Sequence, residues 1–141
     1  MRKKRILIID EESIAVASAR HLLREDGYEV FSHAKAYSAI EMARQLEPDV
    51  ILLDVKPADL TGEKLFAVLR ASDATREIPV IFWSDHAEDV RASAKRFGAR
   101  GYVVKGSEAL LRHCVARVTA SGNAPPPSET SAPTGEGGAT Y

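Results

Sequence analysis

Four short runs of consecutive apolar residues, each followed by an amphipathic stretch, restrict the fold of this chain more than any other feature. Unbroken apolarity, without alternating polar residues, indicates strands buried on both faces, as in a parallel sheet. The runs are residues 6–9, 50–53, 80–83 and 102–104. A weaker fifth run, residues 28–32, has the composition of an edge strand. The pattern therefore predicts a parallel sheet of five strands.

The stretches between the runs have the periodicity of helices, with apolar residues three or four positions apart. Three such faces are Ala36, Ala39, Ile40 and Ala43; Val90, Ala94 and Phe97; and Leu111, Cys114, Val115 and Val118. Asp85 and Glu88 predict a capping box for one helix, and Gly27 and Gly98 stand where helices should end. Strands and helices alternate, and right-handed crossovers place helices on both faces of the sheet. The predicted fold class is a doubly wound α/β domain.

A change in composition divides the chain. Residues 1–120 carry the periodic pattern, and their number suits one domain. Residues 121–141 are rich in Pro, Gly, Ser, Thr and Ala. Such a segment buries too little apolar surface to offset its ordering entropy, so we expect a disordered tail or linker.

Net charge, cysteine content and the length of the apolar runs argue against nucleic-acid binding, disulfide bonding and membrane insertion. The net charge of −1 gives no indication of nucleic-acid binding. The apolar runs are too short to cross a bilayer, and the start of the chain does not have the pattern of a secretory signal. The single cysteine, Cys114, lies on an apolar helix face and reads as a core residue. We expect a cytoplasmic protein with no membrane contact.

Each of the four strong apolar runs is followed by polar residues that carry a charge or can donate a hydrogen bond to one. Asp10 and Glu11 follow the first, Asp54 the second, Ser84 the third and Lys105 the fourth. Parallel strands would bring all of them to one rim of the sheet, where α/β folds bind ligands. Clustered carboxylates form a hard oxygen site suited to Mg²⁺, and a lysine beside them pairs with a carboxylate or a phosphate oxygen. Together these groups fit a site in which a carboxylate attacks phosphorus.

With these residues in this order, the chain resembles the receiver domain of two-component response regulators over roughly residues 4–120. The matching segments are "ILIIDEE", "DVILLDV", "LTGEKL", "IPVIFWSD" and "GARGYVVKG". The resemblance implies a flavodoxin-like (βα)5 fold with strand order 2-1-3-4-5. It also implies a phosphorylation switch that has no enzymatic activity beyond its own phosphorylation and dephosphorylation.

The resemblance assigns a role to each site residue. Asp54 becomes the phosphoacceptor, and Asp10 and Glu11 hold Mg²⁺ or Mn²⁺ together with Asp54 and the backbone carbonyl of Lys56. Lys105 binds phosphate. The assigned switch residues are Ser84 and Tyr102, and the residues that tune dephosphorylation are Lys56 and His86. For Tyr102, plain core packing is an equal alternative.

The resemblance also implies partners. The phosphoryl donor would be a sensor histidine kinase or a histidine phosphotransfer protein. A downstream protein would bind the surface formed by the helix containing Val90, the strand 102–104 and the helix containing Leu111. The expected state is a monomer or a phosphorylation-dependent dimer. The sequence names no kinase, pathway or phosphate lifetime.

Two other functions remain open. One is a pseudo-receiver, a binding module that takes no phosphate. It is suggested by the position of Pro57 and by the Gly106 that replaces the proline usual after the family's lysine. A cis bond without proline costs about 3–4 kcal/mol, so we expect a trans peptide before Gly106. The other is a metal-dependent phosphohydrolase with an aspartyl nucleophile. Lys56, two residues after Asp54, argues against it, because such enzymes carry a second Asp there.

Overall fold

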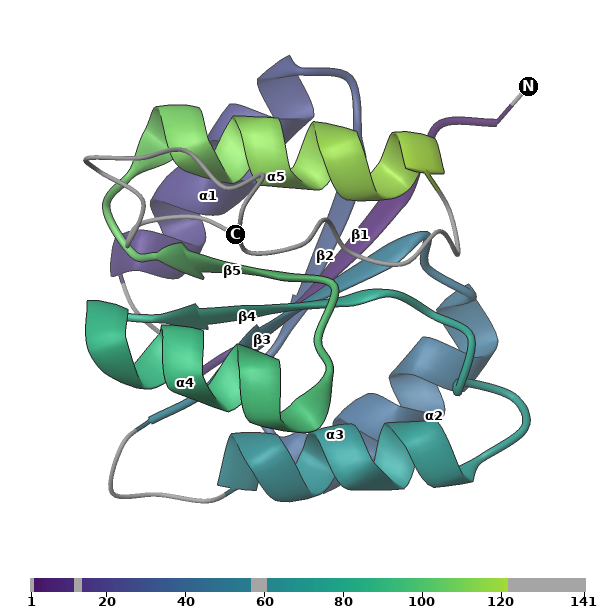
Figure 1. Ribbon diagram of the computed structural model, residues 1–141. Helices are drawn as coiled ribbons and strands as arrows, with labels where there is room; N and C mark the ends of the chain where they lie inside the picture. Colours follow the sequence, from purple (N-terminus) through teal and green to yellow (C-terminus); the bar gives the residue numbers. More distant parts are fainter. Residues whose placement is uncertain (1, 12–13, 57–60, 122–141) are drawn as a thin grey trace.

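The computed structural model describes residues 2–11, 14–56 and 61–121 of the chain. Within these residues, strands and helices alternate five times (Figure 1). The strands are β1 (Arg5–Ile9), β2 (Glu29–His33), β3 (Val50–Asp54), β4 (Val80–Ser84) and β5 (Gly101–Val104). The helices are α1 (Ile14–Glu25), α2 (Ala36–Leu46), α3 (Thr61–Ala71), α4 (Ala87–Phe97) and α5 (Glu108–Ser121). The five predicted strands are therefore all present.

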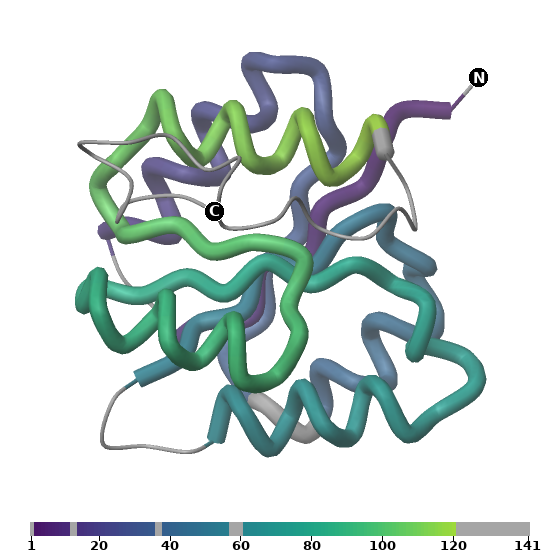
Figure 2. The backbone as a smooth tube through the Cα atoms, viewed as in Figure 1, coloured from purple at the N-terminus to yellow at the C-terminus, as the bar shows by residue number. Residues whose placement is uncertain are grey.

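The strands form one parallel sheet in the order β2-β1-β3-β4-β5. After each helix the backbone returns to the end of the sheet at which the strands begin, so every strand runs in the same direction (Figure 2). The predicted class and strand order are thus confirmed. The weak run at residues 28–32 corresponds to β2, which lies at an edge as predicted.

Two layers of helices cover the sheet, with α1 and α5 on one face and α2, α3 and α4 on the other (Figure 1). The side chains of each strand alternate between the two cores. In β1, Ile6 and Ile8 pack toward α1 and α5, whereas Leu7 and Ile9 pack toward the other helices. Both faces of the central strands are buried, which explains their unbroken apolarity. No helix among the described residues is long and apolar enough to cross a membrane.

Helix ends agree with the sequence in part. Gly98 caps the C-terminal end of α4 in the left-handed conformation, and Gly27 after α1 also has a positive φ. The capping box at Asp85 and Glu88 is wrong, because the N-cap of α4 is His86 and no side chain caps it. Residues 57–60 and 122–141 lie outside the described residues, so Pro57 and the predicted tail remain untested.

The strand order determines where a ligand site can form. The chain leaves β1 toward β2 on one side, and later returns to pair β3 with the other side of β1. The carboxyl ends of β1 and β3 therefore lie at the point where the strand order reverses, which leaves a crevice between the connecting loops. In the register of the sheet Ile9 pairs with Leu53, so the residues that follow them, Asp10 and Asp54, are neighbours.

Candidate functional site

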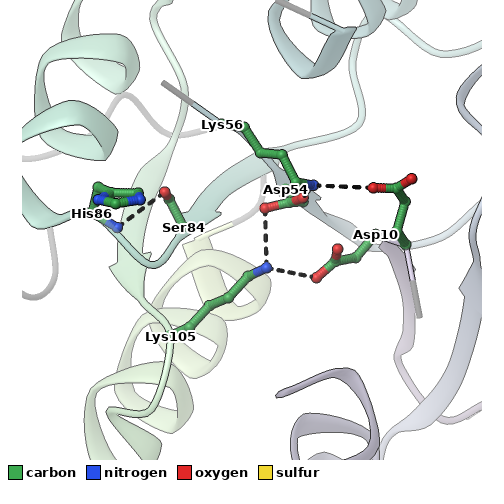
Figure 3. A network of polar contacts seen from close by, with 7 residues as sticks. Asp10, Asp54, Lys56, Ser84, His86 and Lys105 are labelled. Atoms are coloured by element: carbon green, nitrogen blue, oxygen red, sulfur yellow. Dashed lines mark hydrogen bonds and ion pairs between the residues drawn. The ribbon is translucent and has the colours of Figure 1, made fainter. Parts of the chain in front are cut away.

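Four of the residues predicted to share a rim lie together at the carboxyl ends of the strands (Figure 3). Asp54 ends β3, the strand between β1 and β4, so it lies between Asp10 and Ser84. Lys105 follows β5 and reaches across β4 to both aspartates. Asp10, Asp54 and Ser84 are buried. The parallel sheet thus assembles the cluster from segments that are far apart in the sequence.

Lys105 joins the two aspartates. Its Nζ atom lies 2.9 Å from Oδ2 of Asp10 and 3.1 Å from Oδ1 of Asp54, and its side chain is only 8% exposed. The same ammonium lies 4.9 Å from the centre of the Trp83 ring. Burial disfavours the charged form, but the contacts with Asp10 and Asp54 outweigh it and raise the pKa of Lys105. Lys105 is therefore a permanent cation of the site.

Asp10 is held in a less favourable environment. Burial, together with the charge of Asp54, raises the pKa of Asp10 to about 6, although Lys105 acts in the opposite direction. Its Oδ2 atom is buried, and the Nζ atom of Lys105 at 2.9 Å is the cation beside it. Further positive charge beside Asp10 would favour its ionised form.

Lys56 brings a second ammonium to Asp54. Its Nζ atom contacts Oδ2 of Asp54 and lies 3.6 Å from Oε1 of Glu11, while its side chain is 45% exposed. Burial lowers the pKa of Lys56, but the contact with Asp54 and the surrounding acidic charges outweigh this and raise it. The family resemblance implied only a role in dephosphorylation for this side chain, and its contact with Asp54 was not predicted. The signal was present, because side chains two positions apart on an extended chain point the same way.

Gly62, in the matching segment "LTGEKL", has a steric reason to be glycine. It is a buried residue in the first turn of α3, packed against the backbone that follows Asp54. A Cβ atom there would overlap the carbonyl oxygen of Asp54 and lie 3.0 Å from Cγ1 of Val55. The missing side chain lets α3 approach β3 closely.

Ser84 and Tyr102 lie on the β4–β5 side. The Oγ atom of Ser84 accepts a hydrogen bond of 3.1 Å from the backbone N–H of His86. The backbone N–H of Lys105 donates to the carbonyl of Ser84 at 2.7 Å, and the Lys105–Gly106 peptide is trans as expected. Tyr102 is buried in the core beneath α4, so the alternative of core packing describes its present position.

The residues present fit a hydrated magnesium ion. A cleft of about 330 Å³ opens beside the cluster and is lined by Asp10, Glu11, Asp54 and Lys56 among others. Carboxylate oxygens are the ligands that Mg²⁺ prefers, and this ion keeps several of its waters. No group of three or more His, Cys, Asp or Glu side chains within residues 2–11, 14–56 and 61–121 is arranged to hold a metal alone. Water and backbone oxygen would have to complete the coordination.

Comparison with known proteins gives a family match over most of the chain. The model of the family described as response regulator receiver domain matches residues 6–115, a range that contains every site residue named above. The transcriptional regulatory protein PrrA of Mycobacterium tuberculosis is 34% identical over 117 residues, which cover 82% of this chain and 48% of PrrA. The chain thus spans about half the length of this relative. Protein PilH of Pseudomonas aeruginosa is 31% identical over 111 residues, covering 77% of this chain and 92% of PilH.

Two solved structures have a similar fold. The chemotaxis protein CheY4 of Vibrio cholerae has a TM-score of 0.72 and 26% identity, covering 83% of this chain and 99% of CheY4. The receiver domain of the sensor histidine kinase PA1611 from Pseudomonas aeruginosa has a TM-score of 0.73 and 24% identity, covering 84% of this chain and 99% of that domain. That domain was solved with a magnesium ion coordinated in its active site cleft.

Proposed function

This chain belongs to the response regulator receiver domain family, and from that premise we propose that it is a Mg²⁺-dependent switch phosphorylated on Asp54. The position of Asp54 carries the proposal. Its Oδ1 atom pairs with the buried Lys105, and its Oδ2 atom contacts Lys56. Asp54 also lines the cleft, so a phosphoryl donor could approach it from there.

The reaction we propose is transfer from a phosphohistidine of a sensor kinase or a phosphotransfer protein. An oxygen of the Asp54 carboxylate attacks phosphorus, the P–N bond breaks, and its electron pair leaves with the imidazole nitrogen, which takes up a proton. Mg²⁺ held by Asp10, Glu11, Asp54 and the Lys56 carbonyl would neutralise charge on the phosphoryl oxygens. Lys105 already points at Asp54 and would pair with one of those oxygens without reorganisation.

Ser84 would connect phosphorylation to a change in shape. Its Oγ atom accepts a hydrogen bond from His86, which leaves the hydroxyl proton free to donate to a phosphoryl oxygen. Because the same contact anchors the turn that leads into α4, movement of Ser84 would shift this turn and the packing of Tyr102 beneath α4. The added charge of about −1.5 to −2 would then favour a second arrangement of the α4-β5-α5 surface, which binds a downstream protein.

The other properties follow from this role. Chemical activity would be limited to self-phosphorylation and autodephosphorylation, with water access set by Lys56 and His86. The expected setting is the cytoplasm, where the protein would be a monomer or a dimer formed on phosphorylation. One observation favours a pseudo-receiver as a second candidate: Lys56 already supplies a cation to Asp54 and Glu11, so the site has charge compensation from the protein itself.

The experiment that separates the two candidates is intact-mass analysis after incubation with Mg²⁺ and acetyl phosphate or phosphoramidate. We expect one phosphoryl adduct that is lost in Asp54→Asn and in the absence of Mg²⁺. Asp73→Asn, at an exposed carboxylate outside the site, should keep it. Since fast hydrolysis could hide an adduct, Trp83 fluorescence is titrated with beryllofluoride in parallel, because Lys105 lies against the indole ring. No adduct and no fluorescence response would exclude the switch and leave the pseudo-receiver.

A further inference from the structure

Two lysines contact Asp54, and they differ in how firmly they are held. Lys105 approaches Oδ1 from β5 with a side chain that is nearly all buried. Lys56 approaches Oδ2 from the opposite side, and nearly half of its side chain is exposed (Figure 3). A buried ammonium between two aspartates cannot leave without uncovering their charge, whereas an exposed one can swing into water at small cost. Lys56 is therefore the displaceable cation.

Lys56 lies between the carboxylates that the proposed function gives to Mg²⁺. Its ammonium contacts Oδ2 of Asp54 and lies 3.6 Å from Oε1 of Glu11. It thus neutralises two of the carboxylates that the proposed function assigns to the metal ion. A compact ammonium on a flexible stem is the protein group closest in character to a small hydrated cation.

The charge of the site limits how many cations it can hold together. The carboxylates of Asp10, Glu11 and Asp54 surround two ammonium groups, so the ionised cluster has one net negative charge. A divalent ion added while both lysines stay in place would make the cluster net positive. The divalent ion and the ammonium groups would repel one another within so small a cluster. Entry of the divalent ion therefore requires Lys56 to withdraw from Oδ2.

We infer that Lys56 is a tethered competitor of the divalent cation, which covers Oδ2 of Asp54 when the concentration of Mg²⁺ is low and is displaced when it rises. This inference rests on the proposed Mg²⁺ site. It assigns Lys56 a role before phosphorylation, in setting the Mg²⁺ concentration at which Asp54 becomes available, apart from any effect on phosphate lifetime. The free energy of the Lys56–Asp54 contact is subtracted from the affinity for Mg²⁺.

The test is the affinity for Mg²⁺ alone, measured by calorimetry and Trp83 fluorescence in the full chain. Lys56→Met removes the charge and keeps the length of the side chain, and should bind Mg²⁺ roughly 3- to 10-fold more tightly than wild type. Lys56→Arg keeps the charge and should stay within about 2-fold of wild type. Lys35→Met is the matched control. Lys35 lines the same cleft and is exposed, so its replacement reports the effect of cleft charge alone.

A second measurement uses stability. In EDTA, Lys56→Met should melt below wild type, because Asp54 loses a neighbouring cation, and saturating Mg²⁺ should remove or reverse that difference. Equal Mg²⁺ affinities for wild type, Lys56→Met and Lys35→Met would overturn the inference while leaving the proposed function intact. If no variant binds Mg²⁺, both fail. Tighter binding by Lys35→Met to the same extent would also overturn it, since cleft charge alone would then explain the effect.

Discussion

The Nζ atom of Lys105 lies 3.1 Å from Oδ1 of Asp54, and both side chains are almost completely buried. Asp54 ends β3 and Lys105 follows β5, with β4 between these two strands, so the contact exists only when β3, β4 and β5 are all assembled in register. It links Asp54 to the last strand of the sheet, next to α4 and α5. The ion pair is thus both a part of the fold and the nearest fixed positive charge to the proposed phosphorylation site.

Replacing Lys105 should affect stability and chemistry together. Lys105→Met leaves Asp10 and Asp54 facing each other without their shared cation, so we expect the Mg²⁺-free protein to lose about 1–3 kcal/mol. Phosphorylation by acetyl phosphate should slow by about tenfold or more, because charge on the phosphoryl oxygens is less well neutralised. Urea denaturation in EDTA and intact-mass time courses measure the two effects. Lys64→Met, at an exposed lysine of α3, should change neither.

Gly62 offers a test that leaves every charged group in place. A methyl group at this position overlaps the carbonyl of Asp54, so Gly62→Ala must push α3 away from β3. We expect a loss of about 1–3 kcal/mol in urea denaturation and slower phosphorylation, because the backbone of the acceptor moves. Ala67→Ser, an exposed change on the same helix, should leave both measurements near wild type. An unaltered Gly62→Ala protein would mean that the close approach of α3 is unnecessary.

The rim of the site could be predicted from sequence because it follows from topology. Once four buried runs are interpreted as parallel strands, the residues after them must meet at the carboxyl end of the sheet, independently of the conformation of the loops. This argument brought Asp10, Asp54, Ser84 and Lys105 together correctly. Their separation in sequence was no obstacle, since the sheet register determines their distances.

What could not be predicted depends on loop geometry and on side-chain rotamers. The spacing of Lys56 and Asp54 indicates that their side chains point the same way, but the contact between them also requires a particular rotamer of Lys56, which the sequence does not determine. The capping box at Asp85 and Glu88 failed for a similar reason. The Ser84 hydroxyl accepts the hydrogen bond of the His86 N–H, and the turn it anchors makes His86 the N-cap of α4. Side chains in turns compete for the same backbone groups, and a spacing rule does not decide between them.

Ser84 should couple phosphorylation to the α4 side of the molecule. Ser84→Ala removes the acceptor for the His86 N–H, and we expect a loss of about 1 kcal/mol in stability. The adduct on Asp54 should still form, but without the hydroxyl the amides of α4 should show a smaller change in hydrogen exchange on beryllofluoride binding. Ser84→Thr keeps the hydroxyl and should retain the change. If Ser84→Ala responds as fully as wild type, another group must carry the signal.

Asp10 should make the stability of the Mg²⁺-free protein depend on pH with an unusual sign. Its pKa is raised by burial from 3.8 to about 6, so between these values the folded state binds more protons at Asp10 than the unfolded state does. Stability contributed by this group therefore falls as the pH rises from about 4 to 6, by an amount on the order of 2 kcal/mol.

Asp10→Asn has no such proton to lose. In EDTA the variant should be more stable than wild type at pH 7.5, and the difference should shrink by about half at pH 5. Urea denaturation at both pH values measures it, with Asp73→Asn as the exposed control. A difference that stays constant with pH would show that Asp10 is ionised throughout this range and that Lys105 already compensates its charge.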